Sequence, residues 1–92
     1  MELKVLEKIS KALGDIHRLK ILTDMSARGG CIQCAEIMHV TDLAQPSVSH
    51  HIKILSEAGL IASERDGRNY SYTLNGSVLN EYLTEITAIA TI

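Results

Sequence analysis

Residues 45–60 read QPSVSHHIKILSEAGL, and this stretch decides the fold of the chain. Val48, Ile52 and Leu55 recur at the spacing of one helix face. Pro46 falls in the first helical turn, where its missing N–H would have no partner in any case. Gly59 is a typical helix stop. The pattern therefore predicts a short amphipathic helix with one buried stripe.

The opposite face of this helix carries small hydroxyls, an imidazole and an ammonium group, from Ser47, Ser49, His50 and Lys53. Small side chains let a helix backbone come close to DNA, and polar tips can bond base edges in the major groove. The alternative is an ordinary surface helix in contact with water. The segments on either side of this helix decide between the two.

The composition predicts one small domain with an aliphatic core. The chain has 92 residues, of which 46% are hydrophobic, and it contains no Phe and no Trp. No apolar run approaches the ~18 residues of a membrane span, and the N-terminus has no signal core, so we expect a cytoplasmic protein without membrane contact. The formal net charge of −2 argues against a strongly basic nucleic-acid binder, although local charge placement matters more than the total.

Three helices are expected upstream, over residues 2–13, 16–27 and 31–39. Gly14 ends the first, and Asp15 is a suitable N-cap for the second. The buried face of the second helix is expected to consist of Ile16, Leu19, Leu22 and Met25. Residues 40–44 form a turn, so that residues 31–59 have the helix-turn-helix layout.

Downstream, residues 60–65 and 69–74 suit strands, and Asp66-Gly67 between them is a strong hairpin signal. A hairpin directly after a helix-turn-helix is a wing, here over about residues 60–74, with Arg65 and Arg68 at its tip. A last helix over residues 78–92, capped by Asn75 or Ser77, has a broad apolar surface. The expected fold class is mainly α with a β-hairpin wing: a single winged helix-turn-helix domain, residues 1–92, with five helices and a two-stranded wing.

The two terminal helices, about residues 2–13 and 77–91, expose more apolar surface than a small monomer needs, which favours a dimer interface. The alternative is that both helices only cover the core of the monomer.

Several segments, in this order, resemble the ArsR/SmtB family. They are KALGD at 11–15, RLKIL at 18–22, QPSVSHHIKIL at 45–55, EAGLI at 57–61 and DGR at 66–68. The resemblance covers about residues 6–75. It implies a homodimeric winged helix-turn-helix repressor that binds a palindromic DNA operator near its own promoter and leaves it when a metal, a metalloid or another signal arrives.

The resemblance also implies roles for individual residues. It places Gln45, Ser47, Ser49 and His50 against DNA, and the wing tip from Arg65 to Asn69 against phosphate or the minor groove. Gln45 suits adenine, whereas Lys53, Arg65 and Arg68 suit phosphates. Residues 45–72 hold three Lys or Arg and three Asp or Glu, so few phosphate contacts and a moderate salt dependence are expected.

Cys31 and Cys34 form a Cys-x-x-Cys at the expected start of the third helix. Residues i and i+3 of a helix share a face, so both thiols could meet one soft metal or trivalent arsenic. Many family members carry a Cys-x-Cys pair here, but the corresponding positions are Gln33 and Ala35 in this chain. The family's other common metal site, on the last helix, has no counterpart, because residues 78–92 contain no His, Cys or Asp.

Three interpretations of the cysteines stay open: a thiol-ligated metal or metalloid sensor, a Cys31–Cys34 redox switch, or inert thiols. Two thiols alone are too few for a four-coordinate site. No strand is expected before the Cys-x-x-Cys, and no catalytic constellation is present, so an enzyme is not expected. The remaining alternative is a winged-helix protein-interaction module, or a repressor without metal sensing.

The histidines divide into two kinds. His17 and His39 are expected on the surface, and His51, beside the buried stripe, is expected to be packed and hydrogen-bonded or to touch DNA. His50 is the better candidate for a DNA contact.

Overall fold

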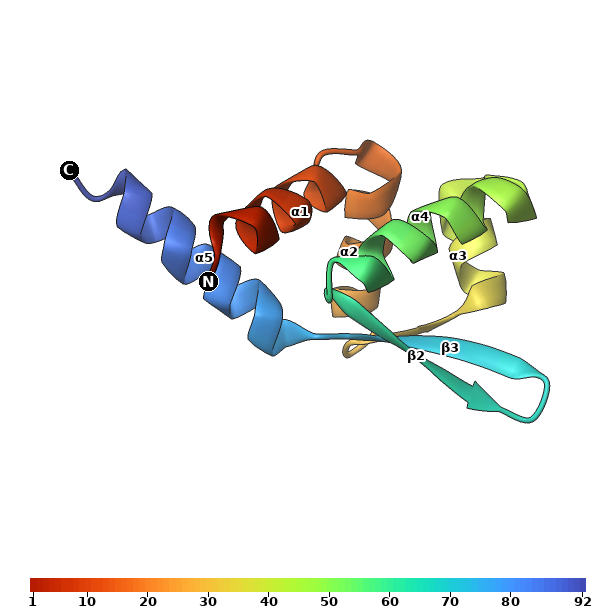
Figure 1. The fold of residues 1–92 in the computed structure, drawn as a ribbon. Coiled ribbons are helices and arrows are strands. Elements are labelled where there is room, and N and C mark those ends of the chain that lie inside the picture. Colours follow the sequence, from red (N-terminus) through yellow and green to blue (C-terminus); the bar gives the residue numbers. More distant parts are fainter.

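The computed structural model describes all 92 residues as five helices and a three-stranded antiparallel sheet. In chain order the elements are α1 (Leu3–Leu13), α2 (Ile16–Ala27), β1 (Cys31–Gln33), α3 (Cys34–Thr41), α4 (Gln45–Glu57), β2 (Ile61–Asp66), β3 (Asn69–Leu74) and α5 (Gly76–Ala90). The β2–β3 hairpin and α5 extend in opposite directions from the body formed by α1–α4 (Figure 1). The chain is therefore elongated, with extents of 47 × 22 × 22 Å.

The helix ends follow the predicted capping chemistry. The Asp15 carboxylate accepts hydrogen bonds from the backbone N–H groups of His17, at 2.8 Å, and Arg18, at 3.3 Å. Gly59, after the end of α4, has a φ of 78°, a left-handed conformation that glycine adopts without steric cost. Asn75 caps α5 by accepting from the Val78 N–H at 3.4 Å.

The core is aliphatic, as the composition predicted. The largest side chains that are fully buried include Ile9, Ile21, Met25, Ile37 and Leu55, which come from all four of the first helices. The β-sheet adds Ile32 and Ile61 to this cluster. The first four helices and the base of the wing thus share one core, whereas α5 has no buried residue.

The expected helix over residues 31–39 is wrong at its start. Cys31–Gln33 form strand β1, which pairs with β3 and places Ile32 opposite Tyr72, so the wing has three strands and not two. Ile32 is buried between two exposed neighbours, which is the alternation of a strand. Gly29 and Gly30, with φ of 83° and 100°, turn the chain toward β3. No strand precedes the Cys-x-x-Cys, as expected, but β1 begins at Cys31 itself, so the motif spans the junction of β1 and α3.

The expected buried face of α2 is wrong at two of four positions. Ile16 and Leu19 are 64% and 46% exposed, whereas Leu22 and Met25 are buried together with Ile21. The helix therefore turns a different face inward, because the spacing of Ile21, Leu22 and Met25 matches the helical period as well as the predicted set does. Ile16 and Leu19 are left on an outer apolar face.

Candidate nucleic-acid interface

A tight turn joins α3 to α4. Asp42 ends α3 in the left-handed region, with φ 55° and ψ 33°, and its N–H donates to the Met38 carbonyl at 3.0 Å. Thr41 fastens the last turn of α3 by donating from Oγ1 to the Ile37 carbonyl at 2.7 Å. After Ala44, α4 begins without a side-chain cap. The two helices together form the helix-turn-helix that the sequence predicts.

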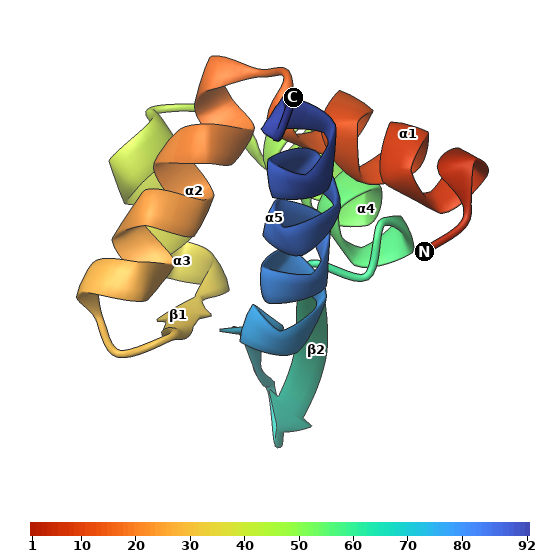
Figure 2. The same cartoon turned by 90° about the vertical axis from the view of Figure 1, so that its left-hand side faces the viewer.

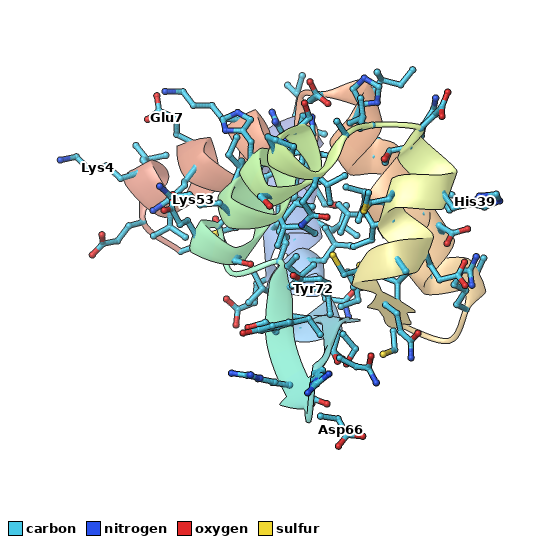
Figure 3. The ribbon with its side chains drawn as sticks, turned by 90° about the vertical axis from the view of Figure 1, so that its right-hand side faces the viewer. Lys4, Glu7, His39, Lys53, Asp66 and Tyr72 are labelled. Carbon is cyan, nitrogen blue, oxygen red and sulfur yellow. The ribbon has the colours of Figure 1, made fainter.

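Helix α4 separates its residues as predicted. Val48, His51, Ile52 and Leu55 are buried, and the five candidate DNA contacts Gln45, Ser47, Ser49, His50 and Lys53 are all exposed. The Gln45 Nε2 donates to Ser49 Oγ at 3.4 Å, so the amide lies over the first turn of the helix. Figure 3 looks at α4 from its outer side, with Lys53 labelled. The exposed face of the helix presents polar side chains, serines among them, and no large apolar side chain.

The wing tip is a two-residue turn. Gly67, with a φ of 63°, and Arg68 join Asp66 to its cross-strand partner Asn69. All residues from 62 to 70 are exposed, including Arg65, Arg68 and Asn69, and Figure 3 shows the hairpin below α4 with Asp66 at its tip. The exposed candidates of the wing and of α4 therefore come from neighbouring elements of one side of the molecule.

No motif of the sequence singles out Tyr70, which is 46% exposed and directly opposite Arg65 in the sheet register. The Arg65 guanidinium lies 5.5 Å from the centre of the Tyr70 ring, a cation–π contact, and its Nε donates to the Gly67 carbonyl at 2.9 Å. Arg65 is thus held along the wing, while Arg68 makes no such contact in the protein. The register of the predicted hairpin would have identified the Arg65–Tyr70 pair.

His51 lies on the inner side of α4 and is packed, which confirms one of the two expectations for this residue. Arg18 Nη1 lies 3.1 Å from His51 Nδ1, and because a guanidinium can only donate, Nδ1 accepts. Burial lowers the pKa of His51 below 6.5, with further lowering by Arg18, His17 and His50, although Asp15 opposes it. The ring is therefore neutral at neutral pH, and its 3.9 Å approach to Asp15 is not an ion pair there.

The surface expectation for His17 is met only in part, because the residue is half-buried. Its ring centre lies 5.5 Å from that of His51, and its Nδ1 is buried without a hydrogen-bond partner. His17 lies in the first turn of α2, where its N–H donates to Asp15, and its ring lies beside that of His51 on α4. His39, in contrast, is exposed on α3, as expected (Figure 3).

The two cysteines lie on different elements. Cys31 is exposed on β1, and Cys34 is the half-buried first residue of α3, so the argument from helical i, i+3 spacing does not apply. Both thiols are free, and no three His, Cys, Asp or Glu side chains converge on a point that could hold a metal ion. The Cys pair of one chain therefore supplies at most part of a ligand set.

Cys34 nevertheless lies next to the candidate DNA contacts. Its Sγ is 4.0 Å from the Gln45 Nε2 at the start of α4. It also lines a shallow cavity of about 270 Å³ together with the wing residues Arg68, Asn69 and Tyr70. Burial raises the pKa of the nearby Tyr72 phenol, and Cys34 and Tyr70 raise it further. A group bound at Cys34 would therefore meet both α4 and the wing.

Comparison with known proteins identifies a family model and relatives that match this chain. A family model described as a helix-turn-helix domain matches residues 13–64. The arsenical resistance operon repressor of Staphylococcus aureus is 34% identical over 91 residues, covering 99% of this chain and 86% of that protein. The transcriptional repressor SdpR of Bacillus subtilis is 34% identical over 76 residues, covering 83% and 82%.

A solved structure leads to the same family as the sequence relatives. The crystal structure of an ArsR family transcriptional regulator superposes with a TM-score of 0.78 at 25% identity, covering 97% of this chain and 93% of that one. The match includes the helix-turn-helix, the wing and both terminal helices, since nearly the whole chain is aligned. The chain belongs to the ArsR/SmtB family of winged helix-turn-helix transcriptional regulators.

Proposed function

We propose that this protein is a homodimeric transcriptional repressor that binds a palindromic DNA operator with α4 in the major groove. The observation that carries the proposal is the exposed polar face of α4 beside an exposed wing. A helix of this width fits the major groove, and the short side chains of Ser47 and Ser49 permit close approach. Because its target is DNA, the proposed activity belongs in the cytoplasm. None of the five helices combines the length and the apolar composition of a membrane span.

Each exposed residue has a proposed contact. Gln45 pairs with adenine, while Ser47, Ser49 and His50 bond base edges or phosphates nearby. Lys53, Arg68 and Asn69 contact phosphate or the minor groove. Arg65 makes the same kind of contact, and its stacking on Tyr70 also stabilises the wing. The N-terminus of α4, which has no side-chain cap, adds a partial positive charge for phosphate.

The proposed dimer surface is the opposite end of the molecule. Leu3 on α1 is 80% exposed, and Leu83, Ile86 and Ile89 on α5 are 52%, 37% and 66% exposed. Figure 2 looks onto α5, with α1 and α2 on either side. A hollow of about 530 Å³ between α2 and α5 extends this apolar surface, with Leu19 on its rim. A second copy covering α1 and α5 would remove this surface from water.

The proposed signal acts through the cysteines. Soft metals and trivalent arsenic prefer thiolates, and the Staphylococcus aureus relative is named for arsenical resistance. Cys34, beside Gln45, is the thiol through which a bound ion would displace α4 or the wing. Cys31 contributes a second thiol, and the remaining ligands would come from water or the partner subunit. A disulfide formed by an added oxidant is the alternative signal at the same place.

The test is operator binding by the purified dimer, measured by fluorescence anisotropy on DNA from the region upstream of its own gene. We expect binding that competitor DNA of random sequence does not remove. Failure of a confirmed dimer to bind at low salt would contradict the proposal and favour a protein-interaction module. Zn(II), Cd(II), As(III) and a peroxide are then titrated into the complex; we expect release by at least one, and a larger loss of response in Cys34→Ser than in Cys31→Ser.

A further inference from the structure

A single guanidinium joins the end of α1 to the inner side of α4. Arg18, in the first turn of α2, donates from Nε to the Ala12 carbonyl at 2.6 Å and from Nη2 to the Lys11 carbonyl at 3.1 Å. Its remaining arm, Nη1, donates to His51 Nδ1 at 3.1 Å. Arg18 therefore contacts three helices at once: its own, the proposed dimer helix and the proposed recognition helix.

The three bonds use the fixed geometry of the guanidinium. The carbonyls of Lys11 and Ala12 lie in the last turn of α1, beyond the reach of the helix's own N–H donors, and the Lys11 carbonyl also accepts from the Gly14 N–H at 3.2 Å. A planar fork can reach both of them and a third acceptor without rearrangement, which a lysine ammonium on a flexible stem cannot do. The contact is therefore specific for arginine and not only for positive charge.

Three neighbours surround Arg18 and His51 in this arrangement: Asp15, His17 and His50. Asp15 accepts from the Arg18 backbone N–H at 3.3 Å and lies 3.9 Å from His51 Nδ1. Acceptance at Nδ1 requires the proton of the neutral His51 ring on Nε2. The ring centres of His17 and His50 lie 5.5 and 5.6 Å from that of His51, so two further imidazoles border this ring.

We propose that Arg18 is a positioning residue for DNA recognition, which fixes the angle between α1 and α4 through its bonds to the α1 carbonyls and His51. This inference rests on the proposed function, since it assigns dimerisation to α1 and base reading to α4. In a dimer, the spacing of the two α4 helices depends on how each is held to its own α1. Two recognition helices must match successive major grooves about 34–36 Å apart, so a small change in this angle lowers affinity.

The first test compares Arg18→Lys with Arg28→Lys in the full-length dimer. Both keep the charge on α2 or its cap, but the ion pairs of Arg28 are to Asp24 on α2 and Glu36 on α3 and not to α1 or α4. We expect Arg18→Lys to bind the operator roughly tenfold more weakly, which is about 1.4 kcal/mol, with an unchanged dimer constant and salt slope. We expect Arg28→Lys to bind like wild type. Operator binding of Arg18→Lys within twofold of wild type, or a parallel loss of dimer, would overturn the proposal.

The second test changes the acceptor and covers the case in which Arg18→Lys folds poorly. The Oδ1 of asparagine can take the place of Nδ1, so we expect His51→Asn to bind the operator more tightly than His51→Leu, although leucine suits the burial better. Equal binding by the two variants would contradict the inference.

Hydrogen exchange of the free dimer provides a readout without DNA. We expect faster exchange in α4 of Arg18→Lys than in α4 of Arg28→Lys, with α5 unchanged. Equal exchange in the two variants would contradict the inference even if operator binding fell. Absence of operator binding by the wild type would defeat the proposed function, whereas wild-type-like behaviour of Arg18→Lys defeats only the role of Arg18.

Discussion

The two ends of this molecule expose surfaces of opposite polarity. At one end, α4 and the wing expose short polar groups and a few charges over a well-packed core. At the other, α5 buries no residue in the single chain and exposes several large aliphatic side chains. A polar face is stable in water without its charged partner, whereas an exposed apolar face of this kind favours a permanent partner. The comparison indicates that the apolar end suits a permanent subunit interface and the polar end a reversible contact with DNA.

The largest effect is expected from a charge placed on the apolar end of the molecule. Ile86→Glu places a carboxylate in the proposed α5 interface, where it would be desolvated without a partner. We expect a monomer at micromolar concentration and operator affinity lower by on the order of 100-fold, because a half-operator is bound by one α4 only. Sedimentation equilibrium and anisotropy measure the two effects.

Thr84→Glu is the matched control, since it adds the same charge to the same helix at a polar exposed position. A dimer of Ile86→Glu as stable as that of the wild type would show that α5 is not the interface.

The next largest effect is expected on the polar end. Gln45→Ala removes the amide that faces a base, and good base contacts contribute about 1–3 kcal/mol of discrimination. We expect operator affinity to fall by roughly tenfold or more, with little change on DNA of random sequence. Competition anisotropy with both DNAs measures the ratio. An equal loss on both would assign Gln45 to phosphate contact.

A smaller effect separates the two arginines of the wing. Arg68 is free at the turn, whereas Arg65 is engaged by Tyr70 and the Gly67 carbonyl. We expect Arg68→Gln to weaken binding about three-fold and to lower the salt slope by about one for each protomer. Arg65→Gln should change the slope less. The measurement is operator affinity at several salt concentrations, and the reverse order of the two variants would contradict this assignment.

The smallest expected effect is on the pH dependence of stability, and it arises from His51, which links the two ends of the molecule. Burial lowers the pKa of His51 from its usual 6.5, so the unfolded chain binds more protons just below that pH. The free energy of unfolding should therefore be highest above pH 6.5 and fall as the pH drops through 6.5 toward the lowered value. Urea unfolding measures it.

The control is His51→Asn, in which this dependence should flatten. Asp15 does not interfere, because the pKa of its carboxyl is also lowered: desolvation raises it, but hydrogen bonds from the His17 and Arg18 amides outweigh this. Asp15 then contributes stability that is lost only below pH 3.8. A wild-type slope that persists in His51→Asn would assign it to another group.

The sequence predicted local features well and distant pairings poorly. The stripe of Val48, Ile52 and Leu55, the Asp15 cap and the Asp66-Gly67 turn are all encoded within a few residues, and all three are present. Strand β1 was missed because its partner β3 lies about forty residues away, and three residues of strand carry too little periodicity to be recognised.

The same limit applies to the site. The exposure of the α4 and wing candidates followed from helical and strand periodicity, but their contacts with DNA stay predictions. The Arg18–His51 bond joins residues 33 positions apart, and no local pattern distinguishes it from two surface polar groups. His17 and the cysteines were misjudged for a related reason, since packing against other elements and not spacing decides their surroundings.

The central claim is that two α4 helices of one dimer read two half-sites. Footprinting of the upstream DNA with a reagent that modifies guanine in the major groove tests it most directly. The account predicts two protected segments about 10–10.5 base pairs apart between centres, related by a two-fold axis, and loss of both in Ile86→Glu. A single protected segment, or two that persist in a proven monomer, would contradict it.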